Sequence, residues 1–162
     1  MKKGPHLIMY DESDNERIVS INFGAVEDGT TSAEIVAWVW NKKNFSDATT
    51  ATDVRVSVTP GNSYAEKVVD EKWIYVKSDG IKDPEGRGIQ DSLNQDWTAI
   101  GGSLLNSGDF LEIGDMPTNC ARRLRFRIDI PAGEDTGGFP IVNVEIGFLS
   151  EKTKWLWASE EF

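Results

Sequence analysis

Residues 120–130 read Cys-Ala-Arg-Arg-Leu-Arg-Phe-Arg-Ile-Asp-Ile, and this alternation of apolar and charged side chains predicts an extended strand. Side chains along a strand point to opposite faces in turn, so each chemical type collects on one face. The apolar face consists of Leu124, Phe126, Ile128 and Ile130. The charged face consists of Arg123, Arg125, Arg127 and Asp129. One buried and one solvated face are typical of strands in antiparallel all-β domains.

The same alternation recurs along the chain, and turn-forming residues interrupt it every ~8–12 residues, as in sandwiches and barrels. A turn-rich break at 131–138 separates the first stretch from a second long strand over Val142–Phe148. Shorter strands are predicted at Leu7–Tyr10, Arg17–Phe23, Glu34–Trp40, Val54–Thr59, Trp73–Lys77, Trp97–Ile100, Phe110–Ile113 and Lys154–Ala158. Ala65–Val69 is consistent with a short helical turn. The sequence therefore predicts an all-β antiparallel sandwich of about nine strands.

The length of 162 residues fits one domain, so we expect residues 1–162 to form a single β-sandwich. After Met-Lys-Lys the apolar run is only Leu7-Ile-Met-Tyr10, shorter than the ~7–15 apolar residues of a secretory signal. No run reaches the ~18 apolar residues of a membrane-spanning helix. We expect a protein that is made in a cytoplasm and has no membrane partner.

The chain is acidic, because 27 acids against 17 bases give a net charge of −10. This balance argues against a nucleic-acid partner, since phosphate binding depends on Lys and Arg. The one basic cluster is the arginine row, which we define as Arg123, Arg125 and Arg127. It fits a solvated strand face paired with acids on neighbouring strands. It also fits a basic strip that docks on an acidic protein partner, and both interpretations stay open here.

Catalytic signals are weak throughout. His6 is the sole histidine and Cys120 the sole cysteine, so a Ser-His-Asp or Cys-His set is not indicated, and a zinc site lacks ligands. No phosphate-binding or dinucleotide-binding glycine motif is present. We expect a non-enzymatic protein with no cofactor and no metal. A small hydrolase that uses paired carboxylates is the weakest alternative.

Two further segments are candidate partner-binding regions. Ser78–Asp96 is predicted as one long loop, and loops of ~20 residues tend to be functional or disordered. Its candidate contacts are Asp83, Arg87, Ile89 and Leu93. Near the end of the chain the candidates are Trp155, Trp157 and Phe162, because aromatics anchor protein interfaces or stack on sugar rings. Trp38, in contrast, is expected to pack in the core between the two sheets.

Some stretches resemble a known group of domains. Residues 21–32, Ile-Asn-Phe-Gly-Ala-Val-Glu-Asp-Gly-Thr-Thr-Ser, lead to Val39-Trp40-Asn41, like the opening of an immunoglobulin-like sandwich. Residues 113–117, Ile-Gly-Asp-Met-Pro, with the strand pair from Arg123, resemble its closing strands. The pattern is similar to small accessory virion proteins of tailed bacteriophages and prophages.

The resemblance implies an immunoglobulin-like β-sandwich that serves as a capsid decoration, neck or tail component. The expected partners are other virion proteins, with a homo-oligomer as a further expectation. The expected location is the virion, after synthesis in the bacterial cytoplasm, and no catalytic residue is implied. The alternative from the residues themselves is a carbohydrate-binding module or host-surface adhesin that uses Trp155 and Trp157.

Overall fold

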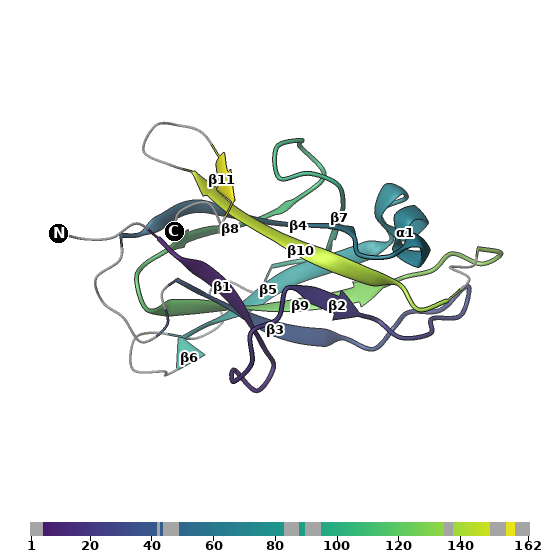
Figure 1. Cartoon of the computed structure of the whole chain (residues 1–162), viewed down its shortest axis with the longest axis horizontal. Coiled ribbons are helices and arrows are strands. Elements are labelled where there is room, and N and C mark those ends of the chain that lie inside the picture. Colours follow the sequence, from purple (N-terminus) through teal and green to yellow (C-terminus); the bar gives the residue numbers. More distant parts are fainter. Residues whose placement is uncertain are drawn as a thin grey trace.

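The structure is a computed structural model that describes residues 5–41, 43, 49–82, 88–89, 95–134, 138–149 and 155–157. Of residues 88–89, 149 and 155–157 it describes the backbone alone. Two antiparallel sheets pack face to face, as Figure 1 shows, and the predicted all-β sandwich is confirmed. The sheet that contains the arginine row is called sheet 1 below, and the other is called sheet 2.

Sheet 1 has the strand order β1-β3-β9-β5-β6, with β7 also paired to β5. Its strands are β1 (Leu7–Asp11), β3 (Ile35–Asn41), β5 (Ile74–Lys82), β6 (Gly88–Ile89), β7 (Thr98–Ile100) and β9 (Cys120–Ile128). Sheet 2 has the order β11-β10-β4-β8, with β2 also paired to β10. Its strands are β2 (Ser20–Asn22), β4 (Ala51–Pro60), β8 (Leu111–Met116), β10 (Ile141–Leu149) and β11 (Trp155–Trp157). In Figure 1 the strands β11, β10, β4 and β8 of sheet 2 lie above β3, β9 and β6 of sheet 1.

The core lies between the sheets and follows the period-two pattern of the sequence. On β9, Leu124, Phe126 and Ile128 are fully buried, while the arginine row alternates with them toward solvent. On β10, Val142 and Phe148 are buried against them from the opposite sheet. Sheets that pack face to face are ~10 Å apart, a space that such interdigitating apolar side chains fill. Burial of this apolar surface is the main force that holds the two layers together.

A short helical turn follows β4, which agrees with one of the structures that the sequence of Ala65–Val69 allowed. The Asn62 side chain accepts hydrogen bonds from the N–H groups of Ala65 (3.1 Å) and Ile141 (3.2 Å), which fixes the turn to the start of β10. The 3₁₀ turn η1 (Ser63–Ala65) and the helix α1 (Glu66–Asp70) then bury Val68 and Val69. Within the part of the chain that the structure describes, no helix has the length and hydropathy needed to cross a membrane.

A buried amide closes one end of the sandwich. Asn41 is fully buried and donates through Nδ2 to the carbonyls of Thr49 (3.0 Å) and Met116 (2.9 Å). Its Oδ1 accepts from the backbone N–H of His6 at 3.0 Å. One side chain therefore ties the start of β1 to both sheets, which positions the strand that borders the groove described below.

Two predicted elements are wrong in extent. The predicted loop at Ser78–Asp96 is in part strand, because β5 continues to Lys82 through a bulge where β5 and β9 shift register between Ser78 and Gly80. Gly80, which falls in the predicted loop, is accommodated within this bulge. The predicted strand Arg17–Phe23 is divided, because its first residues pair with β1 and only Ser20–Asn22 pairs with β10.

Candidate docking surfaces

The arginine row lies on the outer face of sheet 1, where its side chains are about a quarter to a third exposed. Arg123 Nε donates to Asp79 Oδ1 (2.7 Å), and Arg125 Nε donates to Asp79 Oδ2 (2.6 Å). Asp79 is the extra residue of the β5 bulge, and bulges typically redirect a side chain. The bulge therefore places one carboxylate between two arginines of the neighbouring strand.

The titration of these groups reflects the same geometry. Burial acts to raise the pKa of Asp79, but the hydrogen bonds and positive charges of Arg123 and Arg125 outweigh it and lower that pKa below its ordinary value. The pKa of Arg125 is raised, mainly by its hydrogen bond to Asp79. The carboxylate is only 12% exposed, so solvent screens these contacts less than it screens open surface pairs.

The third arginine of the row stacks on an aromatic ring. The Arg127 guanidinium lies 4.2 Å from the centroid of the Trp97 ring, and Lys77 Nζ lies 5.2 Å from the same centroid. Arg127 also forms a long ion pair with Asp129 at 3.7 Å. A cation within ~6 Å of an indole face is attracted by the ring quadrupole. The indole thus offsets part of the local positive charge.

The predicted place of Trp38 is wrong. Trp38 and Trp40 are buried, but they form a second apolar cluster with Ala121 on the outer face of sheet 1. Trp40 Nε1 donates to Asp14 Oδ1 (2.7 Å), and Lys82 Nζ lies 4.0 Å from the Trp38 ring centroid. The inner face of β3 is occupied by Ala37 and Val39, which belong to the main core.

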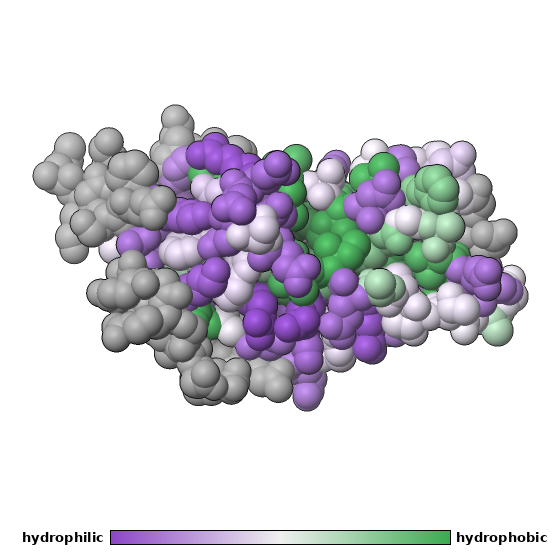
Figure 2. All heavy atoms as spheres, turned by 90° about the horizontal axis from the view of Figure 1, so that it is seen from below, coloured by the Kyte–Doolittle hydropathy of each residue, from purple (hydrophilic) through white to green (hydrophobic). Residues whose placement is uncertain are grey.

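This outer surface of sheet 1, from Trp38 to Trp97, is called the charged face below. Figure 2 shows the molecule from the side of sheet 1, where hydrophilic side chains gather over a large area. Pairing of the arginine row with acids on neighbouring strands, the first of its two interpretations, is observed. Docking of the row on an acidic partner stays a prediction.

The other predicted contacts lie at the margins of the described chain. Ile89 lies in β6 and pairs with Ile81 of β5. Trp155 and Trp157 lie in β11, opposite Leu149 and Gly147 of β10. Asp83, Arg87, Leu93 and Phe162 lie outside the residues that the structure describes. The roles of these residues, and the carbohydrate-binding alternative, stay predictions.

A surface that the sequence did not indicate lies at the open edge of the sandwich. β1 is the end strand of sheet 1, and its Met9 carbonyl accepts a hydrogen bond from the Ile18 N–H (3.0 Å). The chain then crosses to sheet 2, where Val144 N donates to Val19 O (2.9 Å). Before Met9, the outer edge of β1 pairs with no strand among the described residues.

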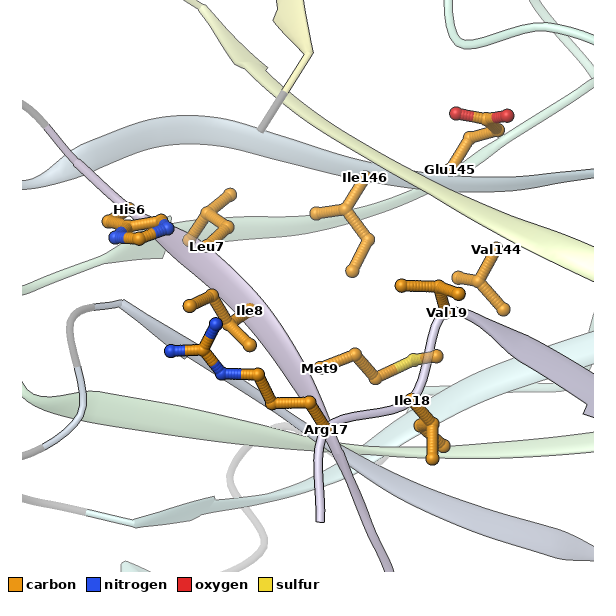
Figure 3. A pocket seen from close by; sticks show the side chains of 10 residues that line it. All are labelled: His6, Leu7, Ile8, Met9, Arg17, Ile18, Val19, Val144, Glu145 and Ile146. Carbon is orange, nitrogen blue, oxygen red and sulfur yellow. The ribbon is translucent and has the colours of Figure 1, made fainter. Parts of the chain in front are cut away.

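A groove of about 330 Å³ opens at this place, between β1 and β10. It is called the edge groove below. Its lining comes from residues 6–9, 17–19 and 144–146 and is mostly apolar. In Figure 3, Leu7, Met9 and Ile146 lie between the two strands. Val19, at the crossing segment, is 76% exposed although its side chain is apolar.

Three polar side chains border the edge groove. His6 and Arg17 come from the side of β1, and Figure 3 shows the Arg17 guanidinium extended toward His6. Glu145 comes from β10 and accepts a hydrogen bond from Thr59 Oγ1 (3.2 Å). Arg17 is exposed and forms no ion pair with any acid that the structure describes. The groove thus combines an apolar interior with one available cation.

The lining of the edge groove is mostly apolar. Among the described residues no three His, Cys, Asp or Glu side chains come together as metal ligands. The sequence predicted one strand over Arg17–Phe23 with its apolar residues on one face, whereas in the structure Val19, at the start of that stretch, is exposed. Comparisons with known proteins gave no match to a family model, a curated protein or a solved structure.

Proposed function

We propose that this chain is a non-enzymatic docking subunit of a larger protein assembly and that it engages its neighbour through the edge groove. The single observation that carries this proposal is the apolar groove beside the incompletely paired edge of β1. Exposed apolar surface next to an open strand edge favours association, because a partner can bury both the side chains and the backbone groups.

The assembly we propose is the particle of a tailed bacteriophage. Support for this setting comes from the resemblance of residues 21–32 and 113–117 to accessory virion proteins. A groove of this size gives a modest contact, and repeated copies on a lattice or ring raise the overall affinity through multivalency. A net charge of −10 keeps the free subunits soluble before they assemble.

The test is site-specific photo-crosslinking in the cells that make this protein. A benzophenone amino acid replaces Val19, which is 76% exposed, so the substitution leaves the core intact. The matched control carries the same group at Leu105, an apolar residue that is 62% exposed and does not line the edge groove. We expect an adduct of one defined mass from position 19 only, and mass spectrometry should identify its partner as a structural subunit of purified phage particles.

Three results would overturn parts of this proposal. Equal adduct patterns from positions 19 and 105 would show that the edge groove is not the docking surface. A specific adduct with a protein that never enters particles would retain the docking function and remove the phage setting. Absence of the protein from purified particles would also remove that setting.

A further inference from the structure

We propose that the occupant of the edge groove is an extended segment of the partner protein, added as a short strand to β1. Its side chains would be apolar at alternate positions, and one carboxylate would face Arg17. This inference rests on the proposed docking function and names the kind of partner that the groove accepts.

The backbone of β1 supports strand addition. Asp11 N–H donates to Glu16 O (2.9 Å) and the Met9 carbonyl accepts from Ile18 N–H (3.0 Å), so the odd-numbered residues direct their polar groups to the outer edge. Residues 16–18 therefore begin a ladder on β1, but the chain then departs for sheet 2. The N–H and C=O of Leu7, which have the same orientation, are left facing the groove without a strand partner among the described residues.

The groove itself supports alternation in the incoming segment. Successive side chains of a strand point to opposite sides, so every second residue would enter the apolar space between β1 and β10. A volume of about 330 Å³ is near the lower limit of sites for small ligands, and it has room for a few side chains. Backbone pairing with pockets for alternate side chains is the usual form of β-strand addition to a sheet edge.

Charge complementarity indicates the carboxylate. The chain as a whole repels acidic segments, with a net charge of −10, so a cation beside the groove is a local exception. Arg17 has no ion pair with a described acid, in contrast to the arginine row on the charged face. One carboxylate in an otherwise uncharged strand fits this arrangement.

The test uses capped synthetic heptapeptides and the full chain labelled with ¹⁵N. The probe is acetyl-Ser-Val-Glu-Val-Ser-Val-Ser-amide, and its matched control has Lys in place of Glu. A third peptide has the probe sequence with an N-methyl group on every residue, which removes all of its backbone N–H donors. We expect the probe to shift the amide signals of residues 7–9 and 144–146, to bind about fivefold more tightly than the Lys peptide, and to lose binding on N-methylation.

Arg17→Glu should reverse the preference between the Glu and Lys peptides. Lys67→Glu, a charge reversal on the helix α1 away from the edge groove, should leave it unchanged. The inference is overturned if the N-methylated peptide binds as well as the probe, or if Arg17→Glu leaves the preference intact. A crosslink at position 19 without peptide binding would support the docking function but overturn the inference. It would show that a folded surface, and not a strand, occupies the groove.

Two other occupants would also overturn the inference. A concentration-dependent dimer that Arg17→Glu disrupts would identify a second copy of this chain. A gain of more than about tenfold in probe affinity when residues 158–162 are removed would identify the chain's own end as the occupant.

Discussion

Substitution of Asp79 by Asn should destabilise the fold, because this one carboxylate accepts the Nε–H of both Arg123 and Arg125. Hydrogen bonds to charged groups contribute ~1.5–3 kcal/mol, whereas exposed ion pairs contribute ~0.2–1 kcal/mol. The carboxylate is 12% exposed and the two arginines are 31% and 25% exposed, which places these contacts between the two limits. At about 1 kcal/mol for each pair, we expect a loss of about 2 kcal/mol in the free energy of unfolding.

Thermal unfolding followed by circular dichroism is a suitable assay. For a domain of this size 1 kcal/mol corresponds to ~2–4 °C, so we expect the melting temperature of Asp79→Asn to fall by about 4–8 °C at pH 7. The matched control is Glu34→Gln, which removes an ion pair with Arg125 at 3.4 Å from a carboxylate that is 45% exposed. That variant should melt within about 2 °C of the parent protein.

The dependence on pH gives a second readout. The folded-state pKa of Asp79 is lower than its unfolded value of ~3.9, so its stabilising contribution is complete above that value and is lost as the pH falls through the folded pKa. The difference in melting temperature between the parent and Asp79→Asn should therefore begin to shrink as the pH falls below about 4, and it should close once the pH is below the folded pKa of Asp79. A difference under about 1 °C at neutral pH, or one that persists at low pH, would refute the role assigned to this carboxylate.

Two further substitutions test contacts that stabilise the sandwich. Asn41→Leu should lower the free energy of unfolding by about 2–3 kcal/mol, because it leaves the carbonyls of Thr49 and Met116 without their amide donor; a change below about 0.5 kcal/mol in a denaturant titration would contradict this. Gly101→Ala should destabilise by more than about 1 kcal/mol, because the added Cβ would lie 2.6 Å from the carbonyl oxygen of Val69. Gly80→Ala is its control, since Gly80 has no positive φ and the corresponding Cβ would lie in ordinary contact, 3.5 Å from the Arg123 side chain, and equal effects of the two substitutions would refute the steric argument.

The long strands and the helical turn were predictable because their signal is local. The alternation at 120–130 gives β9 and its buried face directly, and that at 142–148 gives β10. The same parity places Arg122 among the inward residues, and it is in fact 8% exposed, with its guanidinium donating to the Asp115 carbonyl (2.9 Å). Counting residues along the alternation at 120–130 therefore predicts that Arg122 points inward.

Other features depended on information that no single segment holds. Trp38 and Trp40 alternate with Ala37 and Val39, so both faces of β3 are apolar and the pattern does not say which face is the core. Gly80 signals a turn as readily as it signals a bulge within a strand. The edge groove combines residues 6–9 with residues 144–146, and only the pairing of strands brings these segments together.

We expect a partner to gain more binding free energy at the edge groove than on the charged face. The reason is that the charged groups of the charged face already have partners within the chain. To contact the arginine row, a partner must compete with Asp79 and remove water from charges that are already neutralised. In the edge groove, apolar surface such as that of Val19 is still exposed, and each ~100 Å² of it that is buried contributes about 2.5 kcal/mol. The odd-numbered backbone groups of β1 there also lack a described strand partner before Met9, so hydrogen bonds to them replace only water. The arginine row then acts to hold the inner strands β5 and β9 together, while the docking role that we propose falls to the edge strand β1 of the same sheet.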